Sequence, residues 1–196
     1  PNEIDIKNFP VVSAKNLTLN LSGCKKVDVW AARISYVGES GWEIYFNNNK
    51  GDGLALYDSL LEVGVVPVGI ETYANSRRLE KSFRLQGADL ETEYTAIEAA
   101  IQRPLVKEAD FHGKAAHLAH REEDPCAILC TMTLDDLNVS GKTRYPVGIS
   151  PIIDPATGEV PIDSKGRRSY TTGMSYCPSL KKFVVMGYLP KEIAVQ

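Results

Sequence analysis

Hydrophobic and polar residues alternate along much of the first fifty positions. The segment 16–21 (NLTLNL) places a leucine at every second residue, a period typical of a strand with one buried face. The segment 26–36, rich in valine, isoleucine and aromatic residues, predicts a second strand. The turn-forming residues 38–41 (GESG) then lead into a third expected strand over 42–46 (WEIYF).

The spacing becomes helical after residue 53. Large apolar residues recur at three- and four-residue intervals over 54–61, and Gly64 stands where a glycine ends many helices. A short buried strand is predicted over 65–70 and a further helix over 71–85. Strands and helices in this order predict an α+β layer in which helices cover one face of a sheet.

The last third of the chain has a different texture. Helices are predicted near 95–102 and 113–121, and Asp124-Pro125 marks a boundary. Short β-like runs separated by glycine and proline follow it, at 127–134, 146–153, 159–163, 168–174 and 183–189. Such runs are typical of a small antiparallel barrel or sandwich. We therefore expect two domains, 1–122 and 123–196.

Composition excludes several classes of protein. The 196 residues are 43% hydrophobic and 24% charged, with a formal net charge of −3. A charge so near neutral argues against a nucleic-acid or membrane-surface partner, and no apolar run approaches the roughly 20 residues of a membrane span. Four cysteines without CxxC spacing favour a reducing, cytoplasmic location. The chain begins at Pro1 and ends in an apolar stretch, so we expect it to be a piece of something longer.

Two of the histidines are candidate metal ligands. His117 and His120 lie one helical turn apart, but no carboxylate or cysteine is spaced to complete a zinc site. No metal site is predicted.

Glu43 is the most informative polar residue. In the strand 42–46 it shares a face with Tyr45, whereas Trp42, Ile44 and Phe46 share the other. On pattern alone Glu43 is a solvent-facing carboxylate. A fixed carboxylate also accepts two parallel N–H donors at once, as presented by the amino group and ring N–H of a pterin.

Two arginines and a tyrosine are weaker candidates. Arg77 and Arg78 read on pattern alone as the surface of a mixed-charge helix. Tyr36, on the strand before the turn, would be able to stack on a ring held by Glu43 or hydrogen-bond to it.

The segment 33–46, RISYVGESGWEIYF, resembles the central signature of the glycine-cleavage T-protein family of folate-dependent aminomethyltransferases. The similarity continues in the same order through VGI at 68–70, NSRRLEKSFRLQGADL at 75–90, DFHGKAA at 110–116 and CPSLKKFVVMGYLP at 177–190. Together these motifs extend over most of the chain.

The resemblance implies both fold and activity. It implies a partial ferredoxin-like, folate-binding domain over 1–122 and a small antiparallel β-barrel over 123–196. It also implies tetrahydrofolate as cofactor and transfer of an aminomethyl or methyl group from a small-molecule donor. The family's pterin-binding glutamate and tyrosine fall on Glu43 and Tyr36. Its catalytic aspartate has no counterpart here, so the catalytic residue is unknown and we expect no turnover by this chain alone.

Departures from the family pattern leave three functions open. Ala74 stands where T-proteins carry a folate-holding arginine, and Lys81 follows Glu80 as in sarcosine and dimethylglycine dehydrogenases or folate-dependent demethylases. Arg77 or Arg78 would then orient the ligand or the helix. The chain is a one-carbon transferase that works with a carrier protein, the folate domain of a flavin-dependent amine oxidoreductase, or a non-catalytic folate binder.

Overall fold

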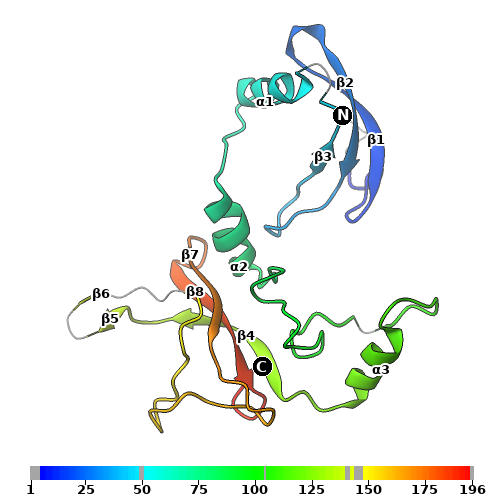
Figure 1. Cartoon of the computed structure of the whole chain (residues 1–196). Helices are drawn as coiled ribbons and strands as arrows, with labels where there is room; N and C mark the ends of the chain where they lie inside the picture. Colours follow the sequence, from blue (N-terminus) through cyan, green and yellow to red (C-terminus); the bar gives the residue numbers. More distant parts are fainter. Residues whose placement is uncertain (1–4, 49–50, 104, 140–141, 144–147, 195–196) are drawn as a thin grey trace. The chain divides into compact units, whose positions relative to one another are not determined.

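The computed structural model describes residues 5–48, 51–103, 105–139, 142–143 and 148–194. The described strands form two three-stranded antiparallel sheets and a short hairpin (Figure 1). The chain divides into two units, Pro1–Tyr73 and Ala74–Gln196, each of which contains one of the larger sheets. The mixed helix and strand content expected from the sequence is confirmed.

The first sheet has the strand order β1-β2-β3. Its strands are β1 (Ala14–Asn20), β2 (Lys26–Ala32) and β3 (Glu43–Tyr45), with the short 3-10 turn η2 (Ser22–Cys24) between the first two. Helix α1 (Asp52–Glu62) follows, and Gly64 just beyond it has a φ of +88°. Three strands and a helix therefore lie where the periodicity predicts them, although β2 ends earlier than expected.

The inner face of this sheet is apolar. Cross-strand neighbours Leu17 and Val29, and Ala31 and Ile44, share that face because paired residues point the same way. Ile44 and Phe46 pack against its buried cluster, formed by Phe9, Leu21, Val27, Val29, Ala31 and Leu56. The alternation of the sequence thus sets which side of the sheet is buried.

The prediction of a buried strand over 65–70 is wrong. The segment contains no strand, and Val66 and Ile70 are 77% and 76% exposed. Pro67 has no N–H to give to a ladder, which weakens the segment as a central strand. The helix expected over 71–85 is also shorter: a π-helical segment η3 (Glu71–Arg77) leads into the single turn α2 (Arg78–Glu80).

The second sheet has the order β4-β8-β7. Its elements and the neighbouring ones are α3 (Lys114–Glu122), β4 (Ala127–Leu134), β5 (Asn138–Val139), β6 (Lys142–Thr143), β7 (Thr171–Cys177) and β8 (Lys182–Pro190). Helix α3 and strands β4 and β8 lie where they were predicted, and β7 begins three residues later than its predicted run.

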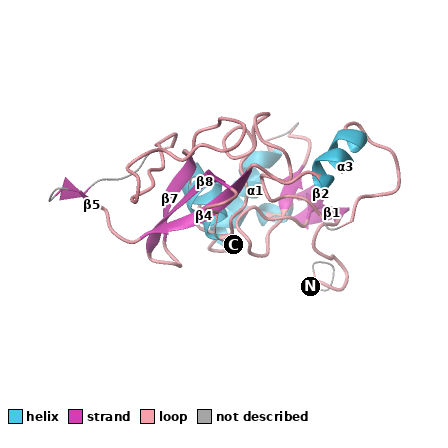
Figure 2. Cartoon of the chain, turned by 90° about the horizontal axis from the view of Figure 1, so that it is seen from below, coloured by secondary structure: helices cyan, strands magenta, loops and turns pink. Residues whose placement is uncertain are grey.

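Three other predicted elements are wrong. The segment 95–102 forms turns rather than a helix, and 159–163 contributes only the single bridge Ile162–Arg168. In 146–153, where positions 146–147 fall outside the described residues, only Pro151 makes a bridge, to Tyr170. Residues 148–170 form no strand longer than a single bridge, and Figure 2 draws the connection that leads into β7 as loop.

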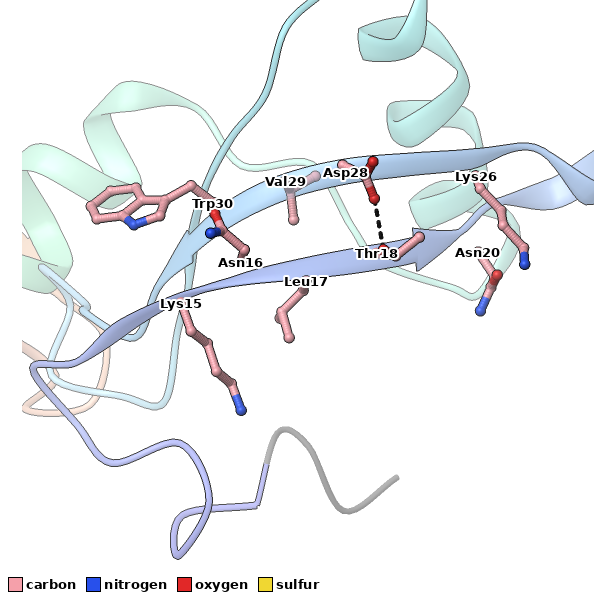
Figure 3. A pocket seen from close by; sticks show the side chains of 9 residues that line it. All are labelled: Lys15, Asn16, Leu17, Thr18, Asn20, Lys26, Asp28, Val29 and Trp30. Carbon is pink, nitrogen blue, oxygen red and sulfur yellow. Dashed lines mark hydrogen bonds between the residues drawn. The ribbon is translucent and has the colours of Figure 1, made fainter.

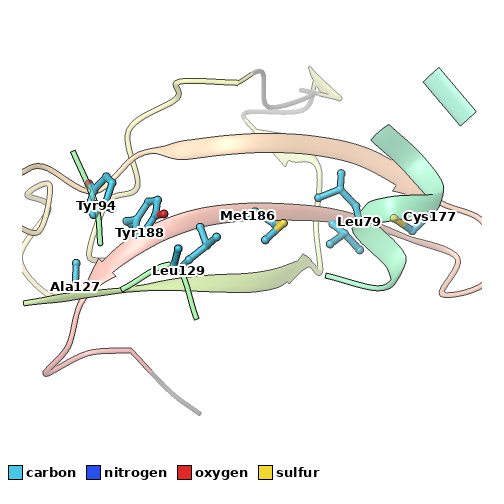
Figure 4. Packing of buried hydrophobic residues seen from close by; sticks show 9 residues of the cluster. Leu79, Tyr94, Ala127, Leu129, Cys177, Met186 and Tyr188 are labelled. Carbon is cyan, nitrogen blue, oxygen red and sulfur yellow. The ribbon is translucent and has the colours of Figure 1, made fainter. Parts of the chain in front are cut away.

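The core of the second unit is a packed row of aromatic, aliphatic and sulfur-bearing side chains (Figure 4). Tyr94 and Tyr188 stack with ring centroids 3.5 Å apart and planes 2° from parallel. The Tyr188 hydroxyl donates to the Asp89 carbonyl at 2.7 Å, so this buried phenol keeps a hydrogen-bond partner. Leu79, from α2 itself, and Met186, from β8, belong to the same core.

An ion network closes one end of this core. Arg167 donates to the Glu98 carboxylate at 2.5 Å and to that of Asp163 at 2.7 Å, and its guanidinium lies 4.3 Å from the centre of the Tyr94 ring. Burial raises the pKa of Glu98, but hydrogen bonds from Arg167 and the Thr95 amide outweigh it and lower that pKa to about 2.

Because the pKa of Glu98 is lowered in the folded chain, we expect the chain to lose stability in acid. The pKa of Glu98 in the folded chain lies below the unfolded value of 4.5, so its stabilisation is present above that pH and is lost as the pH falls toward 2. We expect the free energy of unfolding, measured by urea titration between pH 6 and 3, to fall less steeply in Glu98→Gln than in the unchanged chain. The exposed Glu91→Gln is the matched control, and equal slopes in all three proteins would contradict the prediction.

Some expectations from composition stay predictions. Within the described ranges, no helix is long and apolar enough to cross a bilayer. The cysteines are all free thiols, of which Cys177 is buried. The cytoplasmic location remains an expectation from the sequence.

Candidate functional site

Glu43 begins the short strand β3, on the outer face of the first sheet. Its cross-strand neighbour is Ala32, whereas Ile44 pairs with Ala31 on the inner, apolar face. The partly exposed Glu43 carboxylate accepts a hydrogen bond from the Tyr45 hydroxyl. The predicted division of the strand into a Glu43–Tyr45 face and an Ile44–Phe46 face is confirmed.

The turn before β3 is fixed by its glycines. Gly38 has a φ of +72°, a conformation in which a side chain is strained. The backbone of Gly41 lies against the preceding strand end, and an added Cβ there would come within 3.3 Å of the Ile34 carbonyl oxygen. The two glycines of GESG thereby set where Glu43 leaves the turn.

Arg33 anchors the other end of this connection. Its buried guanidinium donates to the Phe9 carbonyl at 2.6 Å and lies 5.2 Å from the centre of the Trp42 ring. Its backbone continues the pairing of β2 with the segment before β1, through Arg33 N–H to the Ser13 carbonyl at 2.8 Å. The first residue of the signature therefore positions the loop, and the sequence alone did not assign it that role.

Aromatic rings accompany Glu43 on the outer face. Trp30 pairs with Tyr45 across β2 and β3, with ring centroids 5.2 Å apart and planes at 57°. The pKa of the Tyr45 hydroxyl is raised, first by its hydrogen bond to Glu43 and then by slight burial and the charges of Glu43 and Tyr73. Carboxylate, phenol and indole thus form one exposed polar and aromatic surface.

Tyr36 lies in the loop between β2 and β3 and contacts Tyr73. Their ring centroids are 5.9 Å apart, with planes at 49°. Tyr73 therefore gives the Tyr36 ring an aromatic neighbour.

Arg77 and Arg78 belong to the second unit, whereas Tyr36 and Glu43 belong to the first. The Arg77 guanidinium, 35% exposed, donates to Glu80 and to the Ser179 hydroxyl, each at 3.0 Å. Glu80 also accepts the Ser179 amide, and these bonds lower its pKa against the opposing effect of burial. Arg77 thus ties the end of η3 to the turn between β7 and β8.

Arg78 is enclosed by the protein. Its side chain is 1% exposed and forms an ion pair with Asp89, which is itself fully buried. Further hydrogen bonds run to the Ala74 carbonyl at 2.9 Å and the Phe83 carbonyl at 3.1 Å. Gly173 packs against the same guanidinium, where an added Cβ would lie 2.6 Å from it. Of the two suggested roles, these contacts support orientation of the helix rather than of a ligand.

Two residues of the outer face, and the Tyr73 that neighbours Tyr36, were missed by the sequence-based selection. Trp30, Tyr45 and Tyr73 were treated as ordinary strand or helix residues, although Tyr45 was assigned to the face of Glu43. The alternation of faces along a strand could have identified two of them. Once β2 and β3 are paired, Trp30 lies directly opposite Tyr45 and therefore on the same face of the sheet. Tyr73 had no such signal, because its position depends on the path of 63–72.

The donor set of this surface suits a flat, amino-bearing heterocycle. Glu43 is an acceptor of paired N–H groups, and Tyr45 and Trp30 offer ring faces beside it. Tyr36 and Tyr73 form a second pair of aromatic rings. Tyr45 already donates to Glu43, so the carboxylate is held in a defined orientation. The residues present therefore fit a pterin in chemical type.

Comparisons with known proteins identify the family of this chain and several relatives. The model of the GCVT N-terminal domain family matches residues 2–108. The mitochondrial dimethylglycine dehydrogenase of Homo sapiens is 31% identical over 201 residues, which cover 95% of this chain and 20% of that relative. An aminomethyltransferase of Thermosynechococcus vestitus is 30% identical over 166 residues, or 84% of this chain and 40% of that relative.

A solved structure extends the similarity to the fold. The glycine cleavage system aminomethyltransferase T from Bartonella henselae matches with a TM-score of 0.66 and 28% sequence identity. The match covers 86% of this chain and 43% of the Bartonella protein. The chain thus spans less than half the length of each of these relatives.

Proposed function

Because this chain belongs to the GCVT N-terminal domain family, we propose that it serves tetrahydrofolate-dependent transfer of a one-carbon unit, aminomethyl or methyl, from a small-molecule donor. Glu43 and Tyr36 hold the pterin in this proposal. The observation that carries it is the placement of Glu43 on the outer face of β3, oriented by Tyr45 and accompanied by aromatic rings.

The contribution of these residues is binding and orientation. Bound tetrahydrofolate supplies a nucleophilic amine, N5, that takes up the one-carbon unit. Glu43 accepts paired N–H donors and so fixes one edge of the ring system, which makes approach of the donor effectively intramolecular. Tyr36 and Tyr73 offer ring faces that exclude water from one side. The catalytic residue stays unknown.

The arginines have different places in this proposal. Arg78 orients α2 through Asp89 and is assigned no ligand contact. Arg77 is partly exposed and remains the proposed substitute for the arginine that T-proteins carry at the position of Ala74. We also propose, for the whole protein, a ferredoxin-like folate domain over 1–122 and a β-barrel domain over 123–196, although the units of this chain divide at 73/74.

A flavin-linked role is the second candidate. The match to dimethylglycine dehydrogenase covers nearly all of this chain but only a fifth of that relative. In this case the chain is the folate domain of a longer oxidoreductase that receives the one-carbon unit released from a methylated amine. A yellow full-length protein with a flavin absorption spectrum would favour this role, and a colourless one with aminomethyltransferase activity would favour the first.

Titration calorimetry with 5-formyltetrahydrofolate tests the proposal. We expect saturable binding by the chain. Affinity should fall about tenfold or more for the 2-desamino-2-methyl analogue, which lacks the amino donor, because a hydrogen bond to a charged group contributes about 1.5–3 kcal/mol. No binding at millimolar ligand, or equal affinity for the two compounds, would contradict it.

A further inference from the structure

Hollows of small-molecule size occur in both units, and their linings differ in charge. The hollow of about 900 Å³ along β1 and β2 (Figure 3) is lined from both faces of the ribbon, by Leu17 and Val29 of the inner face and Trp30 of the outer one. Lys26 and Asp28 bring both signs of charge into this lining. A lining of mixed faces and mixed charge selects no ligand, and we assign none to it.

A hollow of about 410 Å³ lies in the second unit, between the loop before α3 and α3 itself. Its volume falls in the range of about 300–1,000 Å³ that is usual for small-molecule sites. Aliphatic side chains and one aromatic ring form much of its wall, among them Ile101, Leu105, Val106 and Phe111. We call it the α3 hollow.

Hydrogen bonds hold the loop against α3. Arg121, near the end of the helix, donates to the Arg103 carbonyl at 2.7 Å. Lys114, the first residue of the helix, donates to the Glu108 carbonyl at 2.6 Å. Both ends of the helix are therefore tied to the loop. Because the walls of the α3 hollow are fixed in this way, little conformational entropy is lost when a ligand enters it.

The charged side chains in the lining of the α3 hollow are cationic. Arg103 and Lys107 supply them, and no carboxylate is present among the described lining residues. The Lys107 ammonium lies 5.0 Å from the centre of the Phe111 ring, so a positive charge borders the apolar wall. Glu108 and Asp110 follow in the sequence but do not line the hollow. Charge complementarity therefore favours a ligand with an acidic group on an apolar body.

We propose that the α3 hollow binds an aliphatic carboxylate, a small molecule with an apolar chain and one terminal acidic group. The chain lies against Ile101, Leu105 and Val106. The carboxylate contacts Lys107 beside the Phe111 ring. A small molecule fits better than a peptide, because a hollow of about 410 Å³ would leave most of a peptide in water.

Titration calorimetry with octanoate tests the proposal on the chain as it stands. We expect saturable binding with a Kd of about 0.1–1 mM. Hexanoate should bind more weakly, by about two- to fourfold for each methylene removed, because each buried methylene contributes to the affinity. Octan-1-ol keeps the chain but carries no charge, and should bind about two- to fivefold more weakly than octanoate.

Variants separate the charge from the apolar wall. Lys107→Gln should weaken octanoate binding about two- to fivefold and leave octan-1-ol binding unchanged. Leu105→Ala shortens a side chain that is 87% exposed, so it should keep the fold and weaken both ligands about two- to fivefold. Lys181→Gln removes the same charge from an exposed lysine outside the lining, and should leave both affinities unchanged.

The result is independent of the proposed function. Glu43 belongs to the first unit and the α3 hollow to the second, so Glu43→Gln should bind octanoate as the unchanged chain does. Failure of octanoate to bind would therefore leave the role of Glu43 in place, and failure of the folate experiment would leave the α3 hollow in place.

Amide chemical shifts of the isotope-labelled chain locate the bound octanoate. They should change at Ile101, Val106 and His117, which line the α3 hollow. No saturable binding at millimolar octanoate, or equal affinity for octanoate and octan-1-ol, would overturn the proposal. If the same amides shift with protein concentration in the absence of ligand, a second copy of the chain covers the hollow and the proposal is wrong.

Discussion

Replacing Arg78 with methionine is expected to destabilise the second unit by about 3–5 kcal/mol, the usual cost of removing one partner of a buried ion pair. Asp89 would keep its hydrogen bonds from the Leu85 amide and Thr172, but its charge would lie in the core without a cation. The carbonyls of Ala74 and Phe83 would lose a donor as well. Urea unfolding followed by far-UV circular dichroism measures the effect.

Arg77→Met is the matched control, since it removes the same charge one residue earlier. Its guanidinium is 35% exposed, and its partner Glu80, although only 6% exposed, keeps hydrogen bonds from the Ser179 amide and hydroxyl, so a smaller loss than that of Arg78→Met is expected. If Arg78→Met fails to fold, the double variant Arg78→Met/Asp89→Leu should recover folding, because it removes both charges. Equal destabilisation by the two single variants would contradict the structural role of Arg78.

The contrast between these arginines shows where sequence reasoning ends. Both residues lie in one mixed-charge run, and periodicity gives no reason to bury one and expose the other. The difference comes from contacts about a hundred residues away, with Ser179 for Arg77 and Met186 for Arg78. A local pattern carries no information on which distant strand covers which face of a short helix.

Elements whose burial is decided locally were predictable. β1, β3 and β8 follow from alternation or from a continuous apolar run, and the face of Glu43 follows from its parity with Ile44. The segment 65–70 has a similarly apolar composition but forms no strand. An apolar run becomes a strand only where a partner strand satisfies its backbone, and that partner is not encoded in the run itself.

Glu43→Gln should lower the affinity for 5-formyltetrahydrofolate about a hundredfold or more. A glutamine side chain can accept one N–H donor but presents its own NH₂ group where the carboxylate accepted the second. The charge assistance is lost from both hydrogen bonds, each worth about 1.5–3 kcal/mol with a charged partner. Titration calorimetry against the unchanged chain measures the loss.

Glu39→Gln is the control that distinguishes a specific role of the Glu43 carboxylate from an effect of the net charge of this loop. Glu39 is exposed in the same turn, so its replacement makes the same change in net charge and should leave affinity unchanged. Because the hydrogen bond to Glu43 is the main cause of the raised pKa of Tyr45, Glu43→Gln should also lower that pKa, as followed by NMR titration. A lower Tyr45 pKa with full ligand affinity would show that the substitution altered the site as intended and that Glu43 does not hold the ligand. If Glu43→Gln and Glu39→Gln lower the affinity equally, the effect comes from the loss of one negative charge. A specific contact is then excluded, because Glu39 lies in the turn and only Glu43 lies on β3.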